Sequence, residues 1–277
     1  MKVFISADME GISGISSLKQ VSSAAPEYPQ ARLWMTRDVN AAVQGALEGG
    51  ADEVLVRDAH GPAINILPDR LHPAARLMAG WTPALDMMQG CDASFAVAFF
   101  IGYHPGPPAA GGVLSHTYSV EMIREVWIGG VSAGESLINA LQAGTWDVPV
   151  GLVTGERALR QEIAPALGEA EFVQTKTGFG YQSALLEPLR TCRVLIRAAA
   201  ARAAARAARG PAFPVYRPAL PVEAVVGFHK AEAVTAVQFV PGVQAIDSRS
   251  VRLRAETAAD FIARFQLLTQ VLYGMRS

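Results

Sequence analysis

A strand, a helix and a second strand follow one another at the start of the chain, and this order constrains the fold most strongly. The run KVFISA (Lys2–Ala7) is apolar enough for a strand that is buried on both faces. TRDVNAAVQGALEGG (Thr36–Gly50) predicts a helix that Thr36 caps and that the glycine pair ends. DEVLVRDAH (Asp52–His60) predicts the next strand. Such a unit is typical of a parallel sheet, because parallel neighbours need a crossover connection.

The alternation of strands and helices continues along the chain. Further strands are predicted at Ala93–His104, Val148–Glu156 and Phe172–Lys176, and the last of these closes the sheet. Glu125–Gly144 reads as a strand, a Gly-Gly turn and a helix, and another helix is predicted around Arg157–Leu167. We therefore expect an α/β fold, with a mainly parallel sheet flanked by helices.

The composition changes toward the C-terminus. Val194–Gly210 is rich in alanine and arginine, which favours a helix whose arginines form a solvated face rather than a nucleic-acid patch. Gly210–Pro221 reads as a linker, and short strands and an amphipathic helix at Glu256–Met275 follow it. We expect a catalytic, metal-binding α/β domain at 1–190 and a smaller α+β domain at 191–277, with oligomer contacts as one role for the second.

Charge and cysteine content exclude several classes of protein. The net charge of −1 over 277 residues provides no overall basic field, so we predict no nucleic-acid partner. Cys91 and Cys192 are too far apart in sequence for a disulfide framework and are interpreted as buried thiols. No apolar run approaches the roughly 20 residues of a membrane span, and the segment before Asp8 is too short for a signal-peptide core. We expect no membrane partner and a cytoplasmic location.

Acids and histidines follow the predicted strands at the points where these strands end. In open α/β sheets, ligands bind at the carboxyl ends of the strands. Three of the five histidines fall there or in the loop that follows. The other two, His72 and His229, are interpreted as structural. The candidate metal ligands are Asp8, Glu10, His60, His104 and Glu135.

These five residues form a mixed oxygen and nitrogen ligand set. Carboxylate with imidazole suits zinc, and also manganese, cobalt or iron. The set is too large for one tetrahedral structural zinc and fits two metals about 3.5–4 Å apart. Two divalent cations would also explain why Asp8 and Glu10 lie so close, since buried carboxylates repel one another. The alternative stays open, because acids and histidines at strand ends also cap helices and hold loops.

Five segments, taken in order, resemble the DppA-type D-aminopeptidases, which are zinc peptidases of bacteria. The resemblance covers roughly the first 180 residues and weakens toward the C-terminus. It implies an α/β domain with a smaller second domain, and a homodecamer of two stacked pentamers. The segments are SADMEGISG, VRDAHG, GYHPG, GGVLSHT and AGESLINA.

The resemblance also implies a role for each candidate residue. Asp8 would bridge two zinc ions. Glu10 and His60 would complete one zinc site, and His104 and Glu135 would complete the other. His116 of LSHT matches the position of the catalytic base or nucleophile.

The reaction that follows is hydrolysis of the N-terminal peptide bond of short D-amino-acid peptides such as D-Ala-D-Ala, through a metal-activated water. His116 would transfer protons. Lys176 is a candidate for transition-state or substrate contact, and backbone N–H groups of Gly106–Gly112 are candidate oxyanion donors. The preference for D-residues rests wholly on the resemblance.

Other functions stay open from the residues alone. The same ligand set suits a two-metal hydrolase acting on other small peptides or on phosphoesters, although Arg57 is the lone basic residue beside the metal segments. A non-catalytic peptide-binding protein is a further alternative. A purely structural role for the histidines would have to explain why three of them fall at strand ends or in the following loops.

Overall fold

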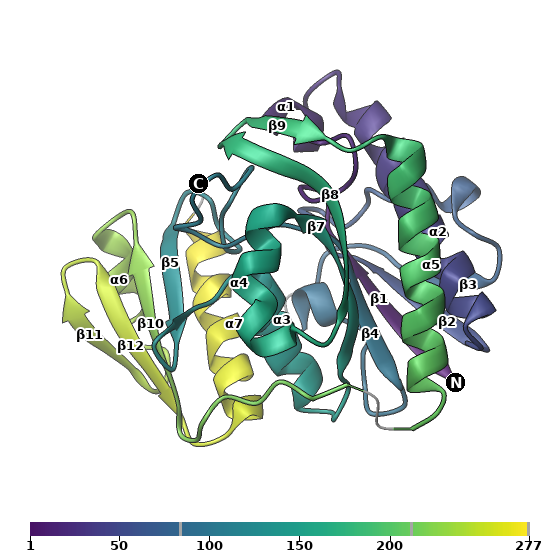
Figure 1. Ribbon diagram of the computed structural model, residues 1–277. Helices are drawn as coiled ribbons and strands as arrows, with labels where there is room; N and C mark the ends of the chain where they lie inside the picture. The colour runs from purple at the N-terminus through teal and green to yellow at the C-terminus, as the bar shows by residue number, and fades with distance from the viewer. Residues whose placement is uncertain (83–84, 211–212, 276–277) are drawn as a thin grey trace.

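The computed structural model describes residues 1–82, 85–210 and 213–275, and arranges them around two sheets (Figure 1). The larger sheet has seven strands in these residues and is parallel except at one edge, where β9 runs antiparallel to β8. The predicted α/β class and the limits of the first strand are confirmed. In spatial order the strands are β3 (Ala75–Met78), β2 (Glu53–Asp58), β1 (Lys2–Ala7), β4 (Val97–Tyr103), β7 (Val150–Glu156), β8 (Glu171–Gly180) and β9 (Ser183–Leu186).

The remaining elements form helices and a smaller antiparallel sheet. The second sheet has the order β11 (Val243–Asp247), β12 (Ser250–Ala255), β10 (Val222–Phe228), β5 (Ile123–Ile128) and β6 (Val131–Ser132). The helices are α1 (Leu18–Val21), α2 (Tyr28–Glu48), α3 (Glu135–Gly144), α4 (Arg157–Leu167), α5 (Leu189–Ala207), α6 (Glu232–Val237) and α7 (Ala258–Gly274). Two short 3₁₀ turns, η1 (Pro68–Arg70) and η2 (Asp86–Met88), lie in loops of the large sheet.

An apolar core covers each face of the large sheet, and the side chains of β1 contribute to both cores. Val3, Ile5 and Ala7 point to one face and join the apolar core under α2 and α5. Phe4 points to the other face and joins the core that contains α3, α7 and the inner face of the second sheet. Because side chains alternate along a strand, a strand buried on both faces must be apolar throughout, as KVFISA is.

The second sheet combines strands from the middle and the end of the chain. β10 pairs with β12 on one side and with β5 on the other. The predicted Gly-Gly turn is the tip of a hairpin, since β6 folds back onto β5 before α3 begins. The division into units at 1–190 and 191–277 stays a prediction.

Helix α2 begins eight residues before the predicted start at Thr36, which was wrong. Pro29 lies in the first turn of α2, where its missing N–H costs nothing, and this start signal was overlooked. Thr36 does not cap the helix, because its hydroxyl donates to the Arg32 carbonyl inside it. The predicted end was close, since α2 stops at Glu48 and Gly49 follows as its C-cap.

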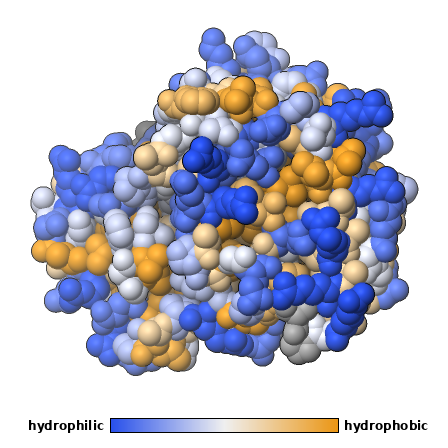
Figure 2. Space-filling view, viewed as in Figure 1, coloured by the Kyte–Doolittle hydropathy of each residue, from blue (hydrophilic) through white to orange (hydrophobic). Residues whose placement is uncertain are grey.

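The prediction that Phe172–Lys176 closes the sheet was also wrong. β8 continues to Gly180 and turns back into β9, which forms the edge. Figure 2 shows an apolar area over this hairpin at the top of the molecule. Its exposed side chains include Phe179, which is 72% exposed, and Leu185, which is 62% exposed.

The alanine- and arginine-rich helix α5 packs on α2 through its small side chains. A Cβ added at Gly45 would lie 2.2 Å from the Arg197 carbonyl oxygen, so glycine permits this close approach. Four of its alanines are buried, namely Ala199, Ala200, Ala203 and Ala204. Arginines of the helix pair with acids at the surface, as Arg197 does with Glu48 and Arg202 with Glu171. This agrees with a solvated arginine face.

The predictions for the two cysteines and for the final helix are confirmed. Cys91 and Cys192 are buried free thiols. None of the helices in the described residues is long and apolar enough to cross a membrane. Residues 211 and 212 of the predicted linker Gly210–Pro221 lie outside the described residues. The final helix, predicted at Glu256–Met275, is α7, which Thr257 caps.

Candidate metal centre

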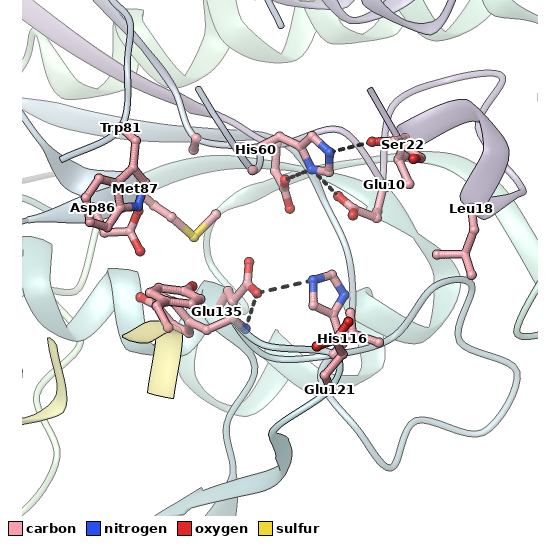
Figure 3. A pocket seen from close by; sticks show the side chains of 17 residues that line it. Glu10, Leu18, Ser22, His60, Trp81, Asp86, Met87, His116, Glu121 and Glu135 are labelled. Atoms are coloured by element: carbon pink, nitrogen blue, oxygen red, sulfur yellow. Dashed lines mark hydrogen bonds and ion pairs between the residues drawn. The ribbon is translucent and has the colours of Figure 1, made fainter. Parts of the chain in front are cut away.

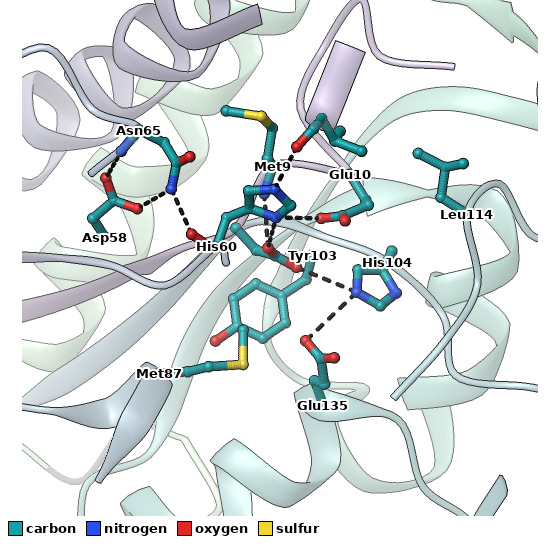
Figure 4. A network of polar contacts seen from close by, with 12 residues as sticks. Met9, Glu10, Asp58, His60, Asn65, Met87, Tyr103, His104, Leu114 and Glu135 are labelled. Atoms are coloured by element: carbon teal, nitrogen blue, oxygen red, sulfur yellow. Dashed lines mark hydrogen bonds and ion pairs between the residues drawn. The ribbon is translucent and has the colours of Figure 1, made fainter. Parts of the chain in front are cut away.

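Three neighbouring parallel strands bring three of the candidate ligands together at the carboxyl ends of the strands. β1 lies between β2 and β4, and Ala7 is in register with Asp58 on one side and Ile101 on the other. Asp8, His60 and His104 follow these three strands and therefore leave the sheet side by side. Figure 4 shows His60 and His104 beside Glu10. Glu10 follows in the loop after β1, and Glu135 opens α3 from the opposite side.

The Asp8 carboxylate lies between two histidines. Asp8 Oδ1 is 3.3 Å from His60 Nδ1, and Asp8 Oδ2 is 3.3 Å from His104 Nε2. Glu10 Oε2 lies 3.0 Å from His60 Nδ1, and Glu135 Oε2 lies 3.5 Å from His104 Nε2. The five predicted ligands thus form two carboxylate–histidine groups that share Asp8.

His116 joins this cluster from the loop between β4 and β5. Its Nε2 lies 3.8 Å from Glu135 Oε1, and its ring stacks on that of His104. The structure therefore brings His116 together with all five predicted ligands. His72 and His229 are elsewhere, and His72 contacts Gln44 on α2.

Backbone carbonyl groups orient all three rings. His60 Nε2 lies 3.0 Å from the Val21 carbonyl oxygen, and His104 Nδ1 lies 3.0 Å from that of Pro105. His116 Nδ1 lies 2.8 Å from the Leu114 carbonyl oxygen. A carbonyl oxygen only accepts, so each of these nitrogens must carry the proton. In the neutral rings, the other nitrogen then presents a lone pair to the carboxylates.

Lone pairs that face carboxylate oxygens at these distances repel unless a proton or a metal ion lies between them. In the described residues, Asp8 Oδ2, Glu10 Oε2 and His104 Nε2 are buried and make no hydrogen bond. Ligand atoms of Asp8, Glu10 and His104 lie within 4.8 Å of one another, and so do those of His104, His116 and Glu135. Three buried carboxylates with imidazole nitrogens therefore fit divalent metal ions such as zinc.

Charge interactions split the pKa values in this cluster. Burial and the Glu10 carboxylate raise the pKa of Asp8 to about 7. Burial disfavours the imidazolium forms of His60 and His104, but the neighbouring carboxylates outweigh it and hold both pKa values well above the usual one. Burial and the charge of His104 lower the pKa of His116. Without metal, protons on His60 and His104 offset the carboxylates, whereas His116 stays neutral.

Lys176 is buried behind Glu10 rather than exposed in the pocket. Its ammonium group donates to the backbone carbonyl oxygen of Glu10. Burial lowers its pKa to about 8, which the charge of Glu156 opposes. Glu156 is in register with Lys176 on the neighbouring strand and accepts a hydrogen bond from Val113 N–H at 2.8 Å. These two residues link the Glu10 loop to the loop that leads to His116.

Sequence reasoning missed several polar residues that support the centre. Asp58 accepts from the backbone N–H groups of Asn65 and Ile66, and the Asn65 side chain donates to the His60 carbonyl oxygen (Figure 4). Asp58 could have been found, because it ends the same strand that His60 follows. Glu162, which accepts from the N–H groups of Gly106 and Gly134, carries no such signal.

The prediction of oxyanion donors in Gly106–Gly112 was wrong at three positions. The Gly106 N–H donates to Glu162 Oε2 at 2.7 Å. The Ala109 N–H donates to the Gly106 carbonyl oxygen, and the Gly112 N–H donates to that of Ala109. These three N–H groups are already used in holding the loop.

A pocket of about 760 Å³ opens onto the cluster (Figure 3). Its described lining includes acidic side chains and no lysine or arginine. Its apolar wall comes from several separate segments. Those apolar and aromatic residues are Leu18, Val21, Ala59, Trp81, Met87, Tyr118, Val120 and Tyr273.

Comparisons with known proteins agree on one family. A family model described as D-aminopeptidase, peptidase family M55, matches residues 1–267. The D-aminopeptidase of Bacillus subtilis (strain 168) is 34% identical over 226 residues, which cover 80% of this chain and 81% of that protein. The solved structure of the Zn-dependent D-aminopeptidase DppA from Bacillus subtilis, described as a self-compartmentalizing protease, superposes with a TM-score of 0.90. It is 26% identical in sequence, and the match covers 100% of this chain and 99% of that chain.

Proposed function

This chain belongs to the D-aminopeptidase family, and on that premise we propose that it hydrolyses the N-terminal peptide bond of short D-amino-acid peptides such as D-Ala-D-Ala at a binuclear zinc site. The zinc-dependent relative supports the choice of zinc. Manganese or cobalt would suit the same mixed ligands.

One observation carries the proposal. The two oxygens of Asp8 each lie 3.3 Å from a different histidine nitrogen, and backbone carbonyls hold each ring so that this nitrogen carries no proton in the neutral form. A carboxylate that lies between two unprotonated imidazole nitrogens can bridge a pair of metal ions. Asp8 would bridge, Glu10 and His60 would complete one site, and His104 and Glu135 would complete the other.

When bound, zinc supplies a Lewis acid that polarises a carbonyl group and lowers the pKa of water. The chain itself must move the protons. We assign this to His116, whose Nδ1–H is held by the Leu114 carbonyl and whose Nε2 is open toward Glu135. Because its pKa is lowered, His116 is neutral and accepts a proton at Nε2, which it can then deliver to the leaving amine.

We propose a positioning role for Lys176 in place of substrate contact. Lys176 is fully buried, and its ammonium group already donates to the Glu10 carbonyl oxygen. It would fix the Glu10 carboxylate at the centre by holding the backbone that carries it.

The charge of the pocket favours a peptide over a phosphoester. Arg57, the basic residue beside the metal segments, donates to the carbonyl oxygens of Asp86 and Gly80 instead of facing the pocket. A phosphoester brings negative charge beside Asp86 and Glu121, the two acidic lining residues outside the proposed ligand set. A peptide with a free N-terminus brings a positive charge.

We also propose that the chain assembles as a decamer of two stacked pentamers in the cytoplasm. The description of the related enzyme as self-compartmentalizing supports assembly. The exposed apolar residues Phe179, Leu185 and Leu186 on the β8–β9 hairpin offer a surface for it (Figure 2).

The deciding experiment measures metal content together with D-Ala release from D-Ala-D-Ala, before and after chelation. About two zinc ions per chain, with activity lost on chelation and restored by zinc, would support the proposal. His60→Ala should lose both, while His72→Ala, a histidine outside the centre, should keep both. Metal without D-Ala release would redirect the assignment to L-peptides or phosphoesters, and peptide binding without turnover would point to a binding protein.

A further inference from the structure

Asp86 lies in the 3₁₀ turn η2 with a backbone conformation that side chains rarely adopt. Its φ is +45°, in the left-handed region. The buried Arg57 holds this conformation, because Arg57 Nε donates to the Asp86 carbonyl oxygen at 2.9 Å and another guanidinium nitrogen donates to that of Gly80. The backbone of Asp86 is thus fixed by groups behind the pocket wall.

The Asp86 side chain, unlike its backbone, is not held by Arg57 hydrogen bonds. It is 8% exposed and lines the pocket, on the wall that carries Trp81 and Met87 and across the cavity from His116 (Figure 3). In the part of the chain that the structure describes, its carboxylate makes no hydrogen bond and no ion pair. Arg57 makes no hydrogen bond to this carboxylate, since its donors go to carbonyl oxygens, and its charge only partly opposes the rise in the pKa of Asp86.

A buried carboxylate without a partner is costly, and here its surroundings make it more so. Burial and the Glu135 carboxylate raise the pKa of Asp86 to about 7. Glu135 is therefore near enough for the two charges to repel. A cation bound between Asp86 and the metal centre would offset both effects.

We propose that Asp86 binds the α-ammonium group of the substrate and so makes the enzyme an aminopeptidase. This inference rests on the proposed function. The α-nitrogen is separated from the scissile carbonyl carbon by a single atom, so a peptide whose carbonyl lies at the metal centre must place its N-terminus close by. Asp86 provides the fixed, buried acceptor that this group needs.

The test compares Asp86→Asn with the wild-type enzyme on two substrates. Asparagine tolerates positive φ and has nearly the same volume, so the substitution removes the charge and keeps the turn. The substrates are D-Ala-D-Ala and N-propionyl-D-Ala, which lacks only the amino group. We expect kcat/KM for D-Ala-D-Ala to fall about 100-fold, as for loss of one partner of a buried charge pair, while the value for N-propionyl-D-Ala is unchanged.

A binding measurement gives a second readout that does not depend on turnover. By calorimetry, D-alaninamide should bind Asp86→Asn about 100-fold more weakly than wild type, and propionamide equally to both. Asp86→Glu, which keeps the charge, should retain part of the preference. Asp69→Asn, the same substitution in the exposed turn η1, should match wild type in every assay.

Three results would overturn the assignment. If Asp86→Asn keeps the wild-type preference for the free amine, another group binds it, with the metal centre as the obvious candidate. If it loses activity equally on both substrates, Asp86 is structural. If wild type neither cleaves D-Ala-D-Ala nor binds D-alaninamide, the proposed function fails as well, which separates that case from the other two.

Discussion

His104 and His116 stack with nearly parallel rings, with centroids 4.2 Å apart and planes inclined by 9°. The two imidazoles nevertheless have opposite electrostatic surroundings. The carboxylates of Glu135 and Asp8 hold the pKa of His104 well above the usual value against the effect of burial, whereas burial and His104 itself lower that of His116. This contrast fits the roles that we propose, with His104 as a metal ligand and His116 as the proton carrier.

Replacement of His116 should separate catalysis from metal binding. His116→Ala should lower kcat for D-Ala-D-Ala by about 10²–10⁴-fold, because the group that accepts and returns the proton is lost. The zinc content should not change, since the proposed ligand set remains. Steady-state kinetics and metal analysis on the same preparation measure both. His72→Ala serves as control, and a His116→Ala variant within a few-fold of wild type would assign proton transfer elsewhere.

Zinc uptake should release protons and weaken as the pH falls. In the metal-free protein, the pKa values of His60 and His104 lie well above 6.5, so both rings are protonated at and below that pH. Zinc must displace these protons, and lowering the pH from 8 to 6 therefore strengthens the competition. Calorimetric titration of metal-free protein in two buffers of different ionisation enthalpy measures the protons released. A binding heat independent of buffer, or an affinity equal at pH 6 and 8, would contradict the assignment of these two rings.

The candidate site was predictable where it depends on strand ends. Asp8, His60 and His104 follow three strands, and adjacent parallel strands bring their carboxyl ends to one edge, so sequence pattern and topology together predict their meeting. Glu135 was found because a glycine turn and a helix start mark its position. The fold class followed from the same alternation of strand and helix.

Other features depend on packing that the local sequence does not encode. Asp86 lies in the turn η2, and its side chain lines the pocket because Arg57 on strand β2 holds the backbone of that turn. Lys176 is fully buried and is in register with Leu186 of the β9 edge strand, which was missed. The pairing of β5 with β10 joins segments that are far apart in the chain, and neither carries a signal for the other. Long-range contacts of this kind override local pattern.

Removal of the buried Lys176 charge should cost both stability and metal affinity. Lys176→Met leaves the Glu10 carbonyl without its donor and Glu156 without the neighbouring positive charge. We expect the free energy of unfolding of the metal-free protein to fall by about 3 kcal/mol, as for other broken buried pairs. Urea unfolding measures this, and zinc titration should show weaker binding.

Lys2→Met removes a surface lysine that pairs with Glu53 and should change stability by less than about 1 kcal/mol. Equal effects of the two substitutions would refute the positioning role.

Substitution of Gly11 should disrupt the centre through the backbone alone. The Gly11 N–H donates to the Gly102 carbonyl oxygen at 2.8 Å, so the loop that carries Glu10 lies directly against the end of β4. An added Cβ would lie 1.9 Å from the Tyr103 carbonyl oxygen, a distance that only movement of one segment can relieve. Because Glu10 precedes Gly11 and His104 follows Tyr103, Gly11→Ala should separate the two zinc sites and destabilise the fold by about 2 kcal/mol or more.

Gly274→Ala is the matched control for Gly11→Ala. Gly274 ends α7, and an added Cβ there would meet no atom of the described residues within 4 Å. Alanine should therefore leave zinc content unchanged and stabilise the protein by up to about 1 kcal/mol, since glycine is the poorer helix former. Thermal unfolding measures the stability of both variants, and metal analysis measures their zinc content. A Gly11→Ala protein that binds zinc as tightly as wild type would mean that the Glu10 loop can shift without loss of the centre, and that close contact with β4 does not set its geometry.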